Sequence, residues 1–130
     1  MYSIEKMDYG FRIVLGGVVG VEEARKWLKE FRALVEEAGE PFNVFVDMRT
    51  LIPFSDEAQE PLQEGQRFAR ELGMIRSVVI LRDNLTTLQL IRLARETGIY
   101  NTERYISSLD NPDWEQQGLD WLLEGKEPTG

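Results

Sequence analysis

Two short apolar segments restrict the fold of this chain more than any other feature. PFNVFVDM occupies residues 41–48, and SVVIL occupies residues 77–81. Segments this short and this rich in β-branched and aromatic residues are typical of strands buried on both faces, as in a parallel sheet. Small and apolar residues between them recur at helical spacing, at Ala58, Leu62, Gly65, Phe68, Ala69 and Leu72. The order strand, helix, strand predicts a right-handed crossover.

The chain before these segments predicts a hairpin and an amphipathic helix. Residues 2–6 alternate in polarity, Asp8-Tyr9-Gly10 is a turn signal, and FRIVLGG resumes as a second strand. Residues 21–38 then predict a helix that ends at Gly39. One face of that helix is apolar, and it is formed by Ala24, Trp27, Leu28, Phe31, Leu34, Val35 and Ala38.

The C-terminal part predicts two more helices and a short strand. A third helix is expected over about 86–97, with Leu88, Ile91 and Ala94 directed inward, and ERYIS at 103–107 is expected to form a strand. Asn111-Pro112-Asp113 predicts the start of the last helix. We therefore expect one α/β domain over residues 1–130, with a mixed sheet of about five strands and about four helices, and a tail that frays from about residue 126.

Composition excludes several classes of function. The chain has no cysteine and no histidine, so disulfides, thiol chemistry, the usual zinc sites and the familiar Ser-His-Asp and Cys-His centres are excluded. We expect no metal and no cofactor. The net charge of -8 repels phosphate backbones, which argues against nucleic acid as a partner. No apolar run approaches the roughly 20 residues of a membrane span, and no signal peptide is evident, so we expect a soluble cytoplasmic protein.

Three stretches resemble the STAS family, named for sulfate transporters and anti-sigma-factor antagonists, and in particular its SpoIIAA-like branch. They are VLGGVVGVEEARKWLKE, VFVDMRTLIPFSDEA and VVILRDNLTTLQLIRLARETGIYNTERYISSLD. The likeness extends from about Phe11 to Leu123. It implies a mostly non-catalytic module that binds partner proteins, and sometimes small ligands, with phosphorylation at the start of the second helix acting as a switch. Relatives grouped under the Sec14 name also imply a lipid-like ligand as an alternative.

Ser55 is the first candidate residue that the resemblance indicates. The family's phosphorylated position falls on Asp56 and its preceding Asp on Ser55, so the acid and the hydroxyl are exchanged. Ser55 is therefore either a phosphorylation or interaction site together with Asp56, or simply the cap of a helix. Pro61 predicts that the regular helix begins near Glu60, with residues 55–59 in a loop or a separate short turn.

Polar side chains after the two buried strands define a candidate pocket. Asp47 and Arg49 leave the first of these strands on the same side, and Arg82 follows the second. Together with Ser55 and Thr86 they would form a small polar pocket. The alternative for Asp47 and Arg49 is a structural ion pair at the end of a strand.

Apolar residues define two further candidate surfaces. Leu51, Ile52 and Phe54 lie in a predicted loop, where they form either an interaction surface or a contact beneath the loop. Trp114 and Trp121 share a helical face, which either packs on the sheet or receives a partner or a second copy of the chain. The glycines before the first long helix fit a tight turn better than a phosphate-binding loop.

These observations give one expectation and one alternative. We expect a non-enzymatic STAS-like regulatory or protein-interaction module, which binds through the 51–58 loop and the helix after it. The alternative is a carrier or sensor with a small-molecule pocket between the sheet and the helices. An enzyme would have to depend on Asp47 without a histidine. The sequence leaves the partner and the oligomeric state, monomer or homodimer, open.

Overall fold

A five-stranded mixed sheet forms the centre of the structure, a computed structural model that describes residues 1–129. The strands lie side by side in chain order: β1 (Tyr2–Met7), β2 (Gly10–Leu15), β3 (Phe42–Asp47), β4 (Met74–Leu81) and β5 (Glu103–Ser107). β1 is antiparallel to β2, and the other neighbours are parallel. The predicted α/β class, with five strands in a mixed sheet and four helices, is confirmed.

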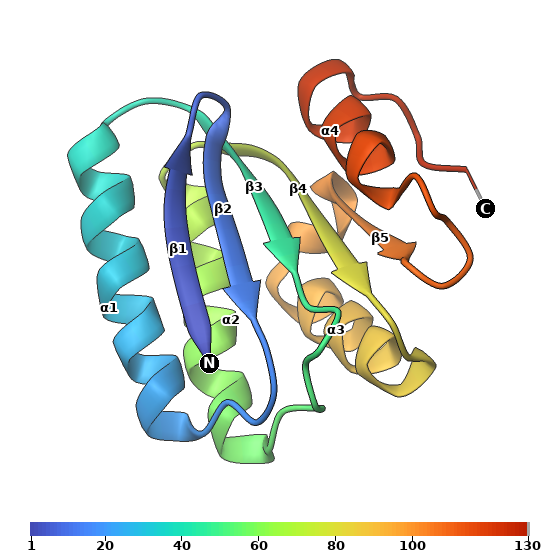
Figure 1. The fold of residues 1–130 in the computed structure, drawn as a ribbon. Helices are drawn as coiled ribbons and strands as arrows, with labels where there is room; N and C mark the ends of the chain where they lie inside the picture. The colour runs from blue at the N-terminus through green and yellow to red at the C-terminus, as the bar shows by residue number, and fades with distance from the viewer. Residues whose placement is uncertain (130) are drawn as a thin grey trace.

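The helices divide unequally between the two faces of the sheet (Figure 1). α1 (Val21–Ala38), α2 (Asp56–Glu71) and α3 (Asn84–Thr97) cover one face, and α4 (Trp114–Glu124) covers the other. Because crossovers between adjacent parallel strands share one hand, the three helices that connect β2 to β5 fall on the same side. A short 3₁₀ helix, η1 (Ile99–Thr102), leads into β5.

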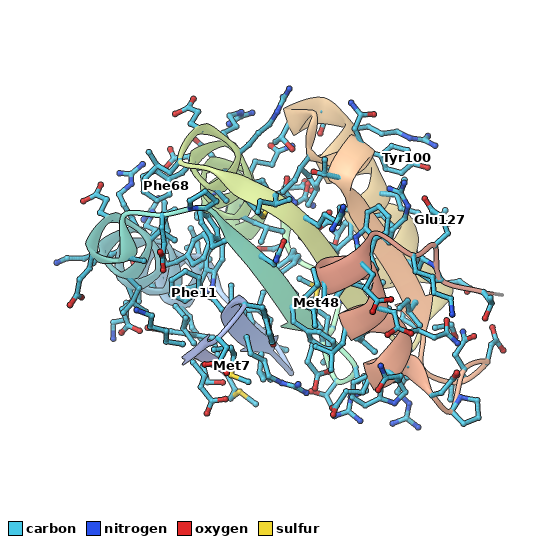
Figure 2. The ribbon with its side chains drawn as sticks, turned by 90° about the horizontal axis from the view of Figure 1, so that it is seen from above. Met7, Phe11, Met48, Phe68, Tyr100 and Glu127 are labelled. Atoms are coloured by element: carbon cyan, nitrogen blue, oxygen red, sulfur yellow. The ribbon has the colours of Figure 1, made fainter. Side chains whose placement is uncertain are left out.

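Aromatic side chains fill the larger core, between the sheet and α1 to α3. Phe11 lies between β2 and α1 (Figure 2), with its ring centroid 6.1 Å from that of Phe31 and 5.7 Å from that of Phe42, both in edge-to-face orientation. Trp27 stacks on Phe31 at 5.4 Å. The apolar face predicted for residues 21–38 is therefore the face that α1 buries.

The smaller core lies beneath α4. Phe45, Val78 and Ile80 are fully buried there. Trp121 packs on them, its Nε1 donates to the carbonyl of Ser77 at 2.9 Å, and the Arg104 guanidinium lies 4.2 Å from its ring centroid. Trp121 is thus a core residue, as the packing interpretation of the last helix predicts.

α2 begins earlier than Pro61 predicts. It is continuous from Asp56 to Glu71, with Pro61 inside it, so the expected loop over residues 55–59 is wrong. Pro61 removes only the hydrogen bond to the carbonyl of Glu57, which is an exposed residue in the first turn. Water can satisfy that carbonyl, which explains why the helix tolerates the proline.

The start of α4 also differs from expectation. α4 begins at Trp114 rather than at the Asn-Pro-Asp turn, because the Asn111 amide instead donates to the carbonyl of Ser107 at 2.9 Å. The tail makes contacts with the rest of the structure as far as Thr129, and its fraying from about residue 126 stays a prediction. Glu127, at the α4 side of the sheet in Figure 2, pairs with Arg104 at 2.8 Å, and the Thr129 N–H donates to Gln117 at 3.2 Å. Residue 130 lies outside the described residues.

Gly118 permits the close approach of α4 to the sheet, and we predict that Gly118→Ala is destabilising. A Cβ at this position would lie 2.6 Å from Cε2 of Phe45, whose ring is fully buried. Chemical denaturation should show a free energy of unfolding lower by about 1 to 3 kcal/mol, the usual effect of overpacking a core. Gln116→Ala, on the exposed side of the same helix, is the control and should change stability by less than about 0.5 kcal/mol. Equal stability of the two variants would contradict this account of the packing.

Candidate functional site

Two loops meet at the edge of the sheet where β2 and β3 end, at the lower end of the view in Figure 1. The Gly17 N–H donates to the carbonyl of Thr50 at 2.9 Å, and the Ile52 N–H donates to the carbonyl of Gly17 at 3.0 Å. Gly17 has a φ of +63°, and a Cβ on Gly16 would collide with the Thr50 hydroxyl. The glycines therefore form a tight, closely packed turn, as the sequence predicts.

Ser55 caps α2 at this edge. Its Oγ accepts a hydrogen bond from the Ala58 N–H at 3.3 Å, and its backbone is extended, as expected for a cap. Ser55 and the two acids that follow it, Asp56 and Glu57, are exposed. The capping interpretation is confirmed, and phosphorylation of Ser55 stays a prediction.

Of the two interpretations of Leu51, Ile52 and Phe54, the contact beneath the loop is confirmed for Leu51 and Phe54, and the interaction surface is wrong for these two residues. Leu51 and Phe54 are buried, with exposed fractions of 4% and 6%, because both side chains insert into the larger core. Gln89 of α3 fixes the loop in this position, since its side-chain amide accepts from the Phe54 N–H and donates to the Phe54 carbonyl, both at 2.8 Å. Ile52 remains outside, 52% exposed.

Ile52, which the sequence offered as a surface residue, is one of four exposed apolar side chains at this edge, and the sequence reasoning missed the other three. Val18, Leu85 and Leu88 are 71%, 68% and 66% exposed. Leu88 was expected to face inward with Ile91 and Ala94; Ala94 is buried as predicted and Ile91 is half-buried, but α3 buries Leu90 and Leu93 in place of Leu88, so the inward face is rotated from the predicted one. We call Val18, Ile52, Leu85 and Leu88 the edge strip.

The residues of the edge strip come from three neighbouring segments. Val18 adjoins Ile52 because the Ile52 N–H bonds the carbonyl of Gly17. Leu85 lies one turn before Gln89 on the same face of α3, and Gln89 bonds the backbone of Phe54. The signal in the sequence was an excess of leucines in residues 85–93, more than one helix face can bury.

The predicted polar pocket divides into separate parts. Arg49 binds Asp47 through Nε at 3.0 Å and through a second guanidinium nitrogen at 2.9 Å, and its backbone N–H adds a bond at 3.1 Å. Thr86 does not line a pocket, because it is fully buried and its hydroxyl donates to Asp83 at 2.8 Å. Arg82 is exposed. Asp47 and Arg49 therefore form the ion pair at a strand end that was the alternative interpretation.

The Asp47 and Arg49 pair connects the edge to α4. Burial by itself would raise the pKa of Asp47, but the hydrogen bonds and charge of Arg49 outweigh it, so the pKa lies below its ordinary value. The Arg49 guanidinium also lies 4.3 Å from the ring centroid of Trp114, at the start of α4. Spacing in the sequence gave no sign of this contact.

A buried carboxyl group lies far from this edge, at the start of β5. Glu103 is 5% exposed, and its carboxyl accepts from the Ser77 hydroxyl at 3.0 Å and from the Tyr105 hydroxyl at 2.7 Å. Burial raises the pKa of Glu103 to about 7, against the opposing effect of these two hydrogen bonds. The sequence placed Glu103 in a short strand and gave no reason to expect its burial.

Glu103 and Ser77 line a cavity in the larger core. The cavity has a volume of about 50 Å³, and most of its other lining is apolar, including Trp27 and Leu90. The Trp27 Nε1 has no hydrogen-bond partner among residues 1–129. An apolar cavity that admits benzene measures about 150 Å³, so this one has room for little more than water.

Residues 1–129 contain no group of three His, Cys, Asp or Glu side chains arranged to hold a metal ion. No helix in the same range is both long enough and apolar enough to cross a bilayer. Neither a protein-family model nor a curated protein sequence matches this chain.

The cap at Ser55 leads to a prediction about stability. Ser55→Ala leaves the Ala58 N–H without its acceptor, so the free energy of unfolding should fall by about 0.5 to 1 kcal/mol, since the bond is long and the site exposed. Ser55→Asp retains an acceptor at the start of the helix and should match the wild type within about 0.5 kcal/mol. Urea denaturation of the three proteins measures both differences. A Ser55→Ala variant as stable as the wild type would show that the hydroxyl contributes nothing as a cap.

The buried carboxyl at Glu103 predicts that stability depends on pH. Between about pH 4.5 and 7 the unfolded chain loses the Glu103 proton while the folded protein keeps it, so the free energy of unfolding should fall as pH rises. The total fall should be about 3 kcal/mol. Asp47, whose pKa is lowered, acts in the opposite direction and only below its ordinary value of 3.8, outside this range.

Glu103→Gln is the matched variant, because the amide cannot titrate and can still bond Ser77 and Tyr105. Urea unfolding at several pH values should show a much flatter profile for this variant between pH 4.5 and 7. A variant profile as steep as that of the wild type would assign the pH dependence to other groups.

Proposed function

We propose that this protein is a non-enzymatic STAS-like regulatory module, which binds another protein through the 51–58 loop and the elements beside it. The observation that carries the proposal is the edge strip. Val18, Ile52, Leu85 and Leu88 expose large apolar side chains together at the end of the sheet that carries Ser55. Several exposed large apolar side chains on neighbouring segments are more typical of interaction sites than isolated ones are.

The chemistry of the same edge supports binding rather than catalysis. The chain has neither histidine nor cysteine, and the carboxylate of Asp47 already accepts three hydrogen bonds from Arg49. A carboxylate held in this way, with a lowered pKa, is a poor general base. Turnover of a substrate by the purified protein, abolished by Asp47→Asn, would contradict this part of the proposal.

The STAS assignment and the role of Ser55 belong to the proposal. The order of the elements and the three stretches of sequence resemblance support the family assignment. Exposure of Ser55 beside the edge strip supports a regulatory role, since a phosphate there would change the charge at the binding surface. The small cavity argues against the alternative of a lipid-like carrier, because about 50 Å³ is too small for an acyl chain.

Site-specific cross-linking tests the binding surface. A photo-reactive amino acid at position 52 should cross-link one protein in the native cells. The same amino acid at position 123 should not, although Leu123 of α4 is 59% exposed. The cross-linked protein, once purified, should bind the wild type and lose about tenfold or more in affinity for Ile52→Asp.

Two outcomes would overturn the proposal. One is equal cross-linking from positions 52 and 123, which would show that exposure alone determines capture. The other is a purified partner that binds Ile52→Asp as tightly as the wild type. Intact-mass measurement of the protein from the same cells, with peptide mapping across Ser55, then tests the regulatory part separately.

A further inference from the structure

We propose that the partner presents a basic amphipathic segment, whose apolar side chains contact the edge strip and whose Lys or Arg side chains enter an acidic groove between α1 and α2. This inference rests on the proposed function, because it specifies the chemistry of the partner at the same surface. The edge strip is apolar and the groove is acidic, and the two lie next to each other.

The acidic groove follows the outer sides of α1 and α2. It has a volume of about 200 Å³, and α2 contributes Glu57, Glu60 and Glu64 to its lining. These residues are three and four positions apart, so they share one face of the helix. α1 contributes Leu28 and a single cation, Arg25. The groove therefore contains more negative than positive charge.

The carboxylates of this groove form no close ion pair with other groups of residues 1–129. Among the described residues, none of the three glutamates forms an ion pair within 4.0 Å. Exposed ion pairs contribute little to stability, so the carboxylates need no internal partner. Three acids in a row along a groove do, however, attract cations and repel anions.

The groove and the edge strip meet at the start of α2. Glu57 lies in the first turn of this helix, directly after the loop that carries Ile52. Val18 lies in the loop that leads into α1, which forms the other wall of the groove. A partner segment bound across the start of α2 would contact the apolar side chains of the edge strip at one end and the carboxylates of the groove at the other.

Charge distinguishes this occupant from the alternatives. A symmetric dimer through the same surface would bring two copies of the three glutamates together, because an isologous interface uses one patch twice. Anionic membranes and nucleic acids carry the same sign of charge as the groove, and the whole chain carries -8. A basic protein segment complements both the groove and the strip.

Calorimetry with synthetic helices tests this inference on the full-length protein. Two peptides are compared, which have the same length and the same leucine face, one with lysine and one with glutamate on the polar face. The Leu/Lys peptide should bind the wild type at least about tenfold more tightly than the Leu/Glu peptide. Binding of the Leu/Lys peptide should weaken as salt is added.

Matched variants separate the surface from general attraction to an acidic protein. Glu60→Lys should weaken binding of the Leu/Lys peptide about tenfold, whereas Glu36→Lys, an exposed position near the end of α1 with the same change in net charge, should have little effect. Ile52→Ser should weaken binding similarly, and Leu123→Ser should not. Circular dichroism and thermal unfolding confirm that each variant is folded.

Three results would overturn the inference: equal binding of both peptides, equal effects of Glu60→Lys and Glu36→Lys, or a concentration-dependent dimer in sedimentation that Ile52→Ser abolishes. The proposed function fails by a different result, the absence of selective cross-linking from position 52. If position 52 captures a protein whose contacting peptide is acidic or uncharged, the binding function stands and this inference fails.

Discussion

Burial of the central strands on both faces is the constraint on which the rest of the structure depends. Phe45, Val78 and Ile80 point toward α4, whereas Val44 and Val79 point toward the other helices, and all five are almost inaccessible to water. Crossovers of a single hand place α1, α2 and α3 on one face. The other face would remain open without α4, so this last helix is an essential layer of the fold.

The same arrangement creates the candidate binding surface. Parallel strands end at one edge of the sheet, so the loops before α1 and α2 meet there and bond to each other through Gly17 and Ile52. Leu51 and Phe54 fill the core beneath the loop, and this anchoring leaves Ile52 directed outward. The exposed strip therefore lies on a rigid support, which favours binding because little order must be gained on association.

Polar groups connect this edge to the opposite layer of the molecule. Arg49 satisfies Asp47 at the end of β3 and also covers the ring of Trp114 at the start of α4. At the opposite edge of the sheet, where β5 begins, the buried carboxyl group of Glu103 accepts hydrogen bonds from Ser77 and Tyr105. The carboxyl groups of Asp47 and Glu103 are both hydrogen-bonded where they are buried. These bonds limit the free-energy cost of removing the two groups from water.

The sequence by itself determined the fold class and the order of the elements, because these depend on local spacing and on the short apolar runs, and it offered the cap as one of the roles of Ser55. It did not determine which apolar residues of a leucine-rich segment face outward. Leu88 was expected inside and is exposed, whereas for Phe54 the sequence left burial and exposure open, and the packing of α3 against the loop through Gln89 decided for burial. The burial of Glu103 and the groove beside Glu60 likewise arise from contacts between distant segments, which only the tertiary structure defines.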